Sequence, residues 1–325
     1  MVLCKSVLGS LGSYLFSLYK VPNKVISQLE SIRNRFFWGS KANERRISWV
    51  AWNVTLNSLD RGGLGIGSLK ACNNALLMQW WWKFKNGQDN IWKKVIKSFY
   101  GTSGNLNDHL AVYKRSSVWG KICSLKDELA KVDIDIMDLF IDVQGRWNWS
   151  LNPSGMFTVK SLREVLDEKY LLKGILKTRW CTGVPRRINI FTWRASRERL
   201  ATKSNLLHRG MSGISPLCPL CSTHDETEEH LFLRCSTAKE LMAQLINWWK
   251  AMPNLDDISS IDDLLNPQGH RGHDALKYEV TVRAFLWTIW LVRNEICFKG
   301  KVKCINQMYS DVRALSVFWL KHRGK

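Results

Sequence analysis

Three cysteines and one histidine lie within a short segment, at a spacing that suits a metal ion. Cys218 and Cys221 are separated by two residues, and His230 and Cys235 follow within the next fourteen. Two cysteines at this spacing can form a tight knuckle that presents both sulfurs to one Zn²⁺ ion, which takes thiolate and imidazole ligands. Three thiolates and one imidazole fill a tetrahedral sphere and leave no position for a water nucleophile. We therefore expect one structural zinc per chain and no catalytic residues at this site.

Two alternatives compete with this ligand set. His224 is a rival fourth ligand, although it lies in a polar loop. The cysteines could also be unrelated buried thiols, but that would not explain His230, which interrupts the run 228–232 as it turns from acidic to apolar. The other six cysteines are too scattered for a recognisable disulfide framework, which predicts a reducing, intracellular compartment.

The charge of the chain favours a polyanionic partner. Its formal net charge is +20 and its pI is near 9.7 over 325 residues. Such a balance attracts nucleic acid through phosphate without conferring sequence specificity. No uncharged apolar run reaches the roughly 18 residues of a membrane span. The expected partner is therefore RNA or DNA and not a membrane.

One basic segment concentrates this charge immediately before the cysteines. Residues 177–209 hold nine Lys or Arg and a single acid, Glu198, with aromatic residues interleaved. Arginine forks can bind phosphate oxygens, and aromatic faces can stack on unpaired bases. Alternatively, the arginine stems lie across a packed aromatic core with their heads in solvent. The candidate nucleic-acid contacts are Arg179, Arg186, Arg187, Arg194, Arg197 and Trp193.

The elements that must position these residues are mostly helical. Alternating apolar residues at 147–149 and 157–159, around a turn at 152–155, predict a β-hairpin. Ser161 and Glu164 suit a capping box for the helix that follows. The expected fold class is α+β, mostly α-helical, with a small β-hairpin and a zinc knuckle between helical segments. Helices are expected near 25–36, 68–84, 241–249, 285–296 and 305–319, and a polar linker over 252–272.

Two further patterns each allow a functional interpretation and a purely structural one. The glycine-rich run 61–67 suggests a tight turn before a helix; a phosphate-cradling loop is less favoured because the P-loop lysine and hydroxyl are missing. Asp133, Asp135, Asp138 and Asp142 could bind Mg²⁺, but such a run is more often a solvated helix face. Neither pattern predicts catalysis.

The sequence resembles the C-terminal part of plant non-LTR, LINE-type retrotransposon reverse transcriptases, including their zinc-binding domain. The resemblance is carried by Trp147-x-Trp149, by residues 185–194 (Pro-Arg-Arg-Ile-Asn-Ile-Phe-x-Trp-Arg) and by the cysteine and histidine spacing. Residues 35–39, 47–49 and 62–66 resemble the segment after the polymerase palm, and Trp287-x-x-Trp290-x-x-Arg293-Asn294 resembles the closing helix.

This resemblance implies four segments. Residues 1–105 would be a post-palm helical region, 106–145 a linker, 146–250 the zinc-binding domain and 251–325 a C-terminal helical region. The aromatic-x-Asp-Asp turn that holds the catalytic metals in this family does not occur in the sequence. The chain is therefore expected to be a truncated remnant without palm or endonuclease, not an enzyme on its own.

Two functions are compatible with these patterns. The first is a zinc-stabilised nucleic-acid-binding module, which could act with an intact retroelement polymerase. The second is a structural or protein-interaction domain in which the aromatic residues form cores and the arginines only solubilise. Salt dependence separates them, because phosphate binding weakens steeply with salt and apolar association does not.

Overall fold

The computed structural model describes residues 1–39, 46–104, 116–143, 146–172, 177–267 and 269–324. Over these ranges the chain is mostly helical, with one two-stranded antiparallel sheet. The chain divides into two compact units, Met1–Ile175 and Leu176–Lys325, here unit 1 and unit 2. The expected fold class, α+β and mostly α-helical, is confirmed.

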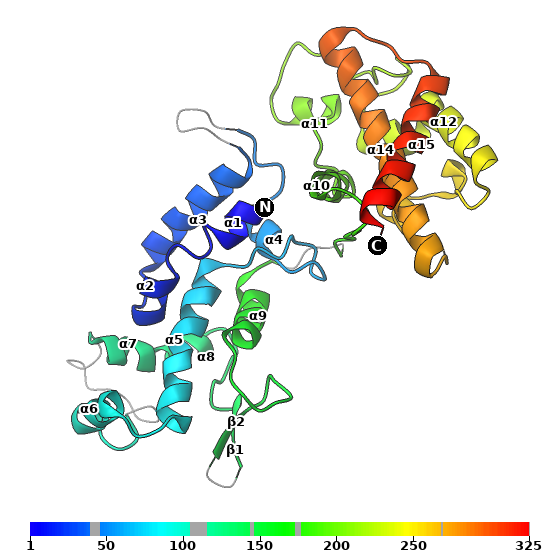
Figure 1. Ribbon diagram of the computed structural model, residues 1–325. Coiled ribbons are helices and arrows are strands. Elements are labelled where there is room, and N and C mark those ends of the chain that lie inside the picture. Colours follow the sequence, from blue (N-terminus) through cyan, green and yellow to red (C-terminus); the bar gives the residue numbers. More distant parts are fainter. Residues whose placement is uncertain (40–45, 105–115, 144–145, 173–176, 268, 325) are drawn as a thin grey trace. The chain divides into compact units, whose positions relative to one another are not determined.

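Unit 1 is built around the long helix α5, beside which α9 lies (Figure 1). Three consecutive indoles leave this helix in different directions, as consecutive helical residues must. The Trp80 indole N–H donates to the Ser17 carbonyl, whereas Trp81 and Trp82 are buried in the core. The elements of unit 1 are α1 (Val2–Ser6), α2 (Ser13–Leu18), α3 (Asn23–Phe37), α4 (Trp52–Leu56), α5 (Leu69–Asn86), α6 (Ile91–Tyr100), α7 (Val118–Cys123), α8 (Leu125–Ala130), β1 (Phe140–Val143), β2 (Arg146–Trp149) and α9 (Val159–Tyr170).

The hairpin forms with a different partner strand from the one predicted. β2 pairs with the preceding strand β1, with Phe140 opposite Trp149, and not with residues 157–159. The Phe157 ring instead packs edge-on against Trp149, with ring centroids 4.9 Å apart, and helix α9 begins at Val159. The predicted pairing was wrong because the Phe157 side chain is buried in the core without its backbone joining a β-sheet.

The cap of α9 also differs from the predicted capping box. Thr158 is the N-cap, and its hydroxyl oxygen accepts a hydrogen bond from the Ser161 backbone N–H at 3.1 Å. The hydroxyl of Ser161 accepts from the buried Trp149 indole at 2.8 Å. The residue predicted as a cap therefore ties the hairpin to α9.

The glycine-rich loop 61–67 turns its amides inwards, so the phosphate-cradling alternative is wrong. Its carbonyl oxygens also have partners, since Arg163 donates to Ile66 and Arg33 to Gly67. Gly65 and Gly67 have φ values of +64° and +74°, which only glycine adopts readily. The N–H groups of Gly63, Gly65 and Gly67 donate to the carbonyls of Ser58, Asn57 and Leu56 at 2.8, 2.6 and 2.8 Å.

A partly buried carboxylate at the end of this loop gives unit 1 a pH-dependent stability. Burial raises the pKa of Asp167, while its bond from the Ser68 N–H opposes the shift. A raised pKa favours the native state below the unfolded value of about 3.9, and this contribution is lost as pH rises through the folded pKa. Asp167→Asn keeps an acceptor for Ser68, so we expect its stability relative to the parent to grow from about pH 4 towards neutrality. Urea unfolding of both proteins across this pH range measures the change; a constant difference would contradict it.

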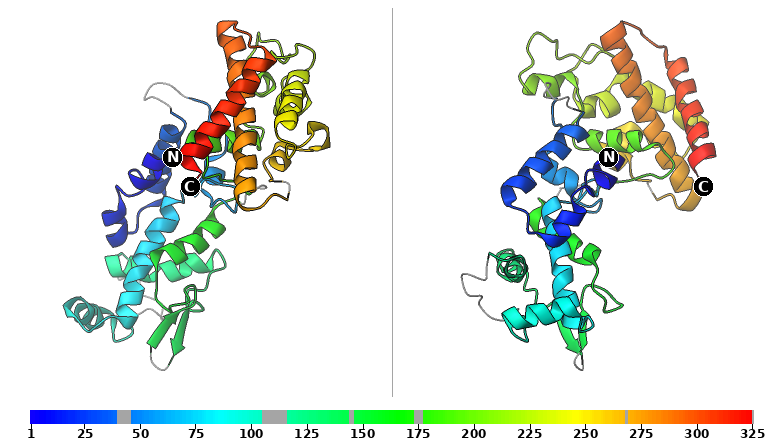
Figure 2. Two further views of the ribbon diagram at one scale, coloured as in Figure 1. Left: turned by 45° about the vertical axis from the view of Figure 1, so that its right-hand side comes forward. Right: turned by 60° about the vertical axis from the view of Figure 1, so that its left-hand side comes forward.

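Unit 2 is organised around α14, and α15 returns alongside it in both views of Figure 2. Helices α10 and α12 complete the core, against α14 and α15 respectively. Although α14 is 28 residues long, no helix in the described ranges has the length and apolar character needed to cross a bilayer. The elements of unit 2 are α10 (Arg186–Ala195), α11 (Lys203–His208), a π-helical turn (His230–Arg234), α12 (Ser236–Trp248), a 3₁₀ turn (Leu255–Asp257), α13 (Ile261–Leu264), α14 (Gly272–Lys299) and α15 (Ile305–Arg323).

The predicted polar linker 252–272 is wrong, because most of its apolar residues are buried in unit 2. Leu255, Ile258 and Leu264 belong to the same core as α12 and α14. The Tyr278 hydroxyl of α14 donates to the Leu264 carbonyl at 3.0 Å, which fixes the segment to that helix.

The compact units cut across the four segments that the resemblance implies. The segment 146–250 contributes β2 and α9 to unit 1 and the cysteine region to unit 2. Helix α9 belongs to unit 1 because Leu162 and Leu166 are fully buried in the core around α5. Residues 251–325, expected as a separate region, share one core with the cysteines.

Candidate metal centre and the basic segment

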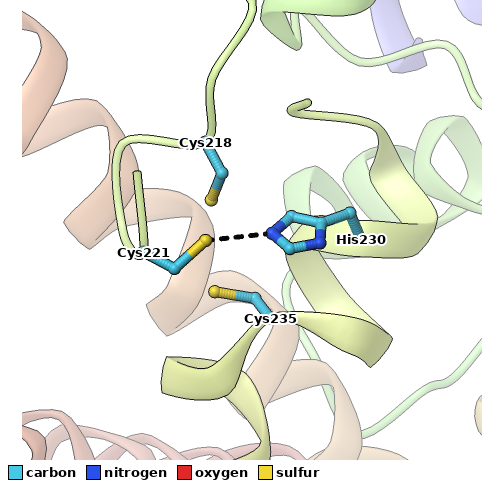
Figure 3. Close-up of side chains that lie close together, drawn as sticks. All are labelled: Cys218, Cys221, His230 and Cys235. Carbon is cyan, nitrogen blue, oxygen red and sulfur yellow. Dashed lines mark hydrogen bonds between the residues drawn. The ribbon is translucent and has the colours of Figure 1, made fainter. Parts of the chain in front are cut away.

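The four predicted ligands meet in unit 2. One ligand atom from each of Cys218, Cys221, His230 and Cys235 lies within 4.8 Å of all the others. Figure 3 shows the three sulfurs and the imidazole gathered around one point. A tetrahedral zinc with Zn–S distances of about 2.3 Å would place ligand atoms about 3.8 Å apart, so this arrangement suits Zn²⁺ with little rearrangement.

His224 is not part of this group. Its ring stacks on His230 with centroids 5.2 Å apart, and its Nδ1 lies 2.9 Å from the Thr223 hydroxyl. Among the residues that the structure describes, these four side chains form the one cluster of His, Cys, Asp or Glu residues that could hold a metal ion. The aspartates between 133 and 142 do not gather into a second one.

A short closed loop presents the first two cysteines. The Cys218 N–H donates to the His224 carbonyl at 2.7 Å, and the Ser222 N–H donates to the Cys218 carbonyl at 2.8 Å. A β-bridge between Leu217 and Asp225 closes the base of the loop. These backbone bonds hold both sulfurs on one side, as the knuckle prediction required.

A π-helical turn brings the other two ligands together. Residues five apart in an α-helix point about 140° away from each other, so His230 and Cys235 would diverge. Here the Cys235 N–H donates to the His230 carbonyl at 2.7 Å, five residues back, and the widened turn carries both side chains to one side. Such turns are rare in proteins, but those that do occur often lie at functional sites.

The electrostatics of the site favour thiolates and a dication. Cys235 is the N-cap of α12, and the hydrogen bond from Cys218, helped by the backbone N–H groups at the helix start, lowers the pKa of Cys235 to about 5. The same contact, together with burial, raises the pKa of Cys218. The pair therefore accepts one negative charge readily and a second only beside a cation. A zinc ion would supply that charge and cross-link the knuckle to α12.

A buried ion pair fixes the cysteine loop to α14. Arg293 donates from Nε and a terminal nitrogen to the two carboxylate oxygens of Glu226, at 2.5 and 2.7 Å. The side chains are 4% and 0% exposed. Arg293 also donates to the Ala201 carbonyl at 3.1 Å, and the Lys203 N–H donates to Glu226 at 2.8 Å. The pair, here called the Glu226–Arg293 clamp, joins the cysteine loop, the end of the basic segment and α14.

A second buried carboxylate holds the end of the basic segment. Glu228 accepts from the Leu200 N–H at 2.8 Å and from the Asn205 side chain at 2.7 Å. Burial raises the pKa of Glu228, and the bond from the Leu200 N–H opposes the shift. The two buried glutamates before His230, Glu226 and Glu228, are therefore structural, and Glu228 orients α11 beside the cysteine loop.

The structure separates the six predicted nucleic-acid contacts into two groups. Arg186 and Arg187 are exposed in the first turn of α10. Arg179 is partly exposed and lies 3.5 Å from Asp262. The guanidinium groups of Arg186 and Arg187 are accessible to a phosphate, whereas Asp262 competes for that of Arg179.

The remaining three predicted contacts turn towards the protein. Trp193 is 3% exposed, so its ring is not offered to a base. Arg197 lies over that ring at 5.2 Å and donates to the Trp193 carbonyl, and Arg194 donates to the Arg199 carbonyl. Burial lowers the pKa of both Arg194 and Arg197 to about 10. These residues therefore fit the alternative in which the arginine stems lie across a packed aromatic core.

Two features of the site were not found from the sequence. The clamp joins residues 67 positions apart, and no local pattern links them. Trp287 and Trp290 of α14 flank Phe191 of α10, with ring centroids at 5.1 and 6.0 Å. Their spacing of three on one helix was the available signal, because it places both indoles on one face.

Comparison with known proteins places the metal centre in a family. Residues 157–241 match the family described as zinc-binding in reverse transcriptase. A putative ribonuclease H protein of Arabidopsis thaliana is 21% identical over 386 residues, covering 94% of this chain; the chain spans only 61% of that protein. An uncharacterised mitochondrial protein of the same plant is 27% identical over 123 residues, covering 38% of this chain and 80% of that protein. Residues 157–241 of the chain therefore match the zinc-binding domain of reverse transcriptases, in line with the resemblance to plant retrotransposon proteins.

Proposed function

We propose that the chain acts as a zinc-stabilised nucleic-acid-binding module, derived from a LINE-type retrotransposon reverse transcriptase. The observation that carries the proposal is the Cys₃His cluster inside the matched domain, joined through the Glu226–Arg293 clamp to the end of the basic segment. One zinc would hold this region in a single conformation, with Cys218, Cys221, His230 and Cys235 as ligands. RNA or DNA is the partner, bound mainly through phosphate, and an intact retroelement polymerase is a further one. No catalysis is expected of this chain alone.

Charge and exposure support phosphate contact through the start of α10. Arg186 and Arg187 are adjacent, exposed and part of a segment with nine basic residues and one acid. Arginine binds phosphate oxygens through two parallel N–H bonds, and each neutralised phosphate releases counterions. Affinity should therefore fall as salt rises, in proportion to the number of contacts.

Replacing both arginines by glutamine tests this directly. Each phosphate contact on a single strand contributes about 0.7 to the slope of log affinity against log salt, so we expect the double variant to lose about 1.4 of that slope. The measurement is fluorescence anisotropy with a labelled single-stranded RNA at several salt concentrations. The matched control is Lys299→Gln with Lys301→Gln, which removes the same charge at exposed positions near the C-terminal end of α14. Equal loss in both double variants would contradict a localised contact.

A protein-interaction role is the second candidate function. It is favoured by the inward packing of Trp193, Arg194 and Arg197 and by exposed apolar residues on α14. Under that role, zinc retention would be unchanged, and RNA affinity would be weak at every salt concentration. The salt series above distinguishes the two functions.

A further inference from the structure

Helix α14 leaves an apolar stripe on its solvent side, in the unit that carries the metal centre. Trp287, Leu291 and Phe298 lie at the helical spacing that places residues on one face, and the polar Asn294 interrupts this face between the last two. Leu291 is 41% and Phe298 79% exposed, and Trp287 and Trp290 are partly exposed. Exposed aromatic residues grouped on one face often mark a binding site, and they suit a ligand that has apolar faces of its own.

The two indoles are held in place from below. Phe191 of α10 packs edge-on against Trp287 at 5.1 Å with an interplanar angle of 75°, and it lies 6.0 Å from Trp290. Arg293, fixed by the Glu226–Arg293 clamp, lies 5.0 Å from the Trp290 ring. Because both rings are supported before a ligand arrives, little side-chain freedom remains to be lost on binding.

A cationic group lies beside the same rings. The guanidinium of Arg187 is 5.9 Å from the centre of the Trp287 ring, and Arg186 is exposed next to it. A planar guanidinium over an indole presents its outer face, on which a base can stack, while the neighbouring arginine reaches phosphate. The combination suits a ligand with both flat apolar rings and negative charge.

We infer that this surface, made of Arg186 and Arg187 from α10 and Trp287 and Trp290 from α14, binds single-stranded nucleic acid by stacking on unpaired bases. The inference rests on the proposed function and narrows its ligand from nucleic acid in general to strands with unpaired bases. Bases in a duplex are already stacked on their neighbours, so only a single strand can offer them to the indoles. The aromatic contact predicted at Trp193 is thus supplied by α14.

The first test compares three labelled ligands with the full zinc-loaded chain. These are a single-stranded RNA, an oligonucleotide of the same length and charge whose central positions are abasic, and the RNA paired with its complement. We expect the single strand to bind about ten-fold more tightly than the abasic strand, since removing bases removes stacking but keeps phosphates. The duplex should bind no more tightly than the abasic strand.

The second test changes the indole. Trp287→Leu should lose about ten-fold in affinity for the single-stranded RNA and little for the abasic strand, whereas Trp287→Phe should keep most of the affinity. Trp248→Leu is the matched control, because Trp248 is 37% exposed and also lies beside an arginine, with Arg313 at 5.3 Å. Zinc content and the thermal unfolding midpoint show whether each variant is folded.

The outcomes separate this inference from the proposed function. Equal affinity for the base-containing and abasic strands, or an equal loss in Trp248→Leu, overturns the stacking surface. If Arg186→Gln with Arg187→Gln still lowers the salt slope in that case, the proposed function stands. Absence of salt-dependent binding to all three ligands would sink both. The ligand comparison uses the parent protein, so it decides even if Trp287→Leu fails to fold.

Discussion

Cys235→Ala is expected to lose zinc and to unfold much of unit 2. Cys235 is fully buried, belongs to the group of four predicted ligands, and occupies the N-cap position of α12. A structural zinc site contributes on the order of 10 kcal/mol at neutral pH, and a missing thiolate removes a large part of that free energy. Cys218, Cys235 and the apolar side of α14 share one core, so the loss should spread through the unit. Metal analysis gives zinc per chain, and circular dichroism gives the thermal midpoint.

The control for this prediction is Cys297→Ser. Cys297 is exposed on α14 and lies outside the metal group, so its variant should keep one zinc per chain and the parent's midpoint. Cys221→Ser should behave like Cys235→Ala, because its sulfur lies 3.2 Å from His230 Nε2 in the same group. Full metal occupancy in either ligand variant would contradict the four-ligand assignment.

Arg293→Met is expected to destabilise unit 2 by about 3 to 5 kcal/mol, the usual cost of removing one partner of a buried ion pair. The Glu226 carboxylate would stay buried with its charge uncompensated, because Lys203 supplies only a backbone N–H. Urea unfolding, followed by far-ultraviolet circular dichroism, measures the loss of free energy.

A pair of variants shows whether the ion pair is the cause. Adding Glu226→Leu to Arg293→Met removes the orphaned charge, so part of the lost stability should return. Arg313→Met is the matched control, since Arg313 is exposed and lies over Trp248 and Tyr309 without a buried carboxylate partner of this kind. A loss below about 1 kcal/mol in Arg293→Met, the range of surface pairs, would show that the clamp is not needed for the fold.

The metal ligands could be predicted because their geometry is local. Cys218 and Cys221 belong to one closed loop, and a single turn joins His230 to Cys235. A site whose ligands are close together in the sequence can be recognised from the spacing of those residues. The periodic helices α3, α5, α12, α14 and α15 were predictable for the same reason, and all five are found, although α12 begins at Ser236 and α14 at Gly272, well before the expected starts at 241 and 285.

Features that depend on distant partners could not be predicted in this way. The strand paired with β2 lies before it and not after it, because Phe157 finds a place against Trp149 in the core. The Glu226–Arg293 clamp joins two residues whose surroundings in the sequence give no sign of each other. Pairing of this kind is decided by packing, which a single sequence does not display.

Burial explains the difference between the predicted and observed basic surface. Trp193 and Arg197 have the right residue types for nucleic-acid contact, but α10 turns Trp193 towards the core, and Arg197, just after the helix, donates back to the Trp193 carbonyl. Helical spacing alone could not orient α10, since apolar and basic residues alternate around it. The partly exposed indoles come instead from α14, about a hundred residues further along the chain.

The most direct test of the account compares RNA binding by the full chain with and without zinc. The affinity for a labelled single-stranded RNA is measured at low and at physiological salt, before and after the metal is removed by a chelator and then restored. We predict tight, salt-dependent binding with one zinc per chain, loss of most of that affinity on chelation, and recovery when zinc returns. Affinity that is the same with and without zinc would contradict a binding surface held together by the metal centre.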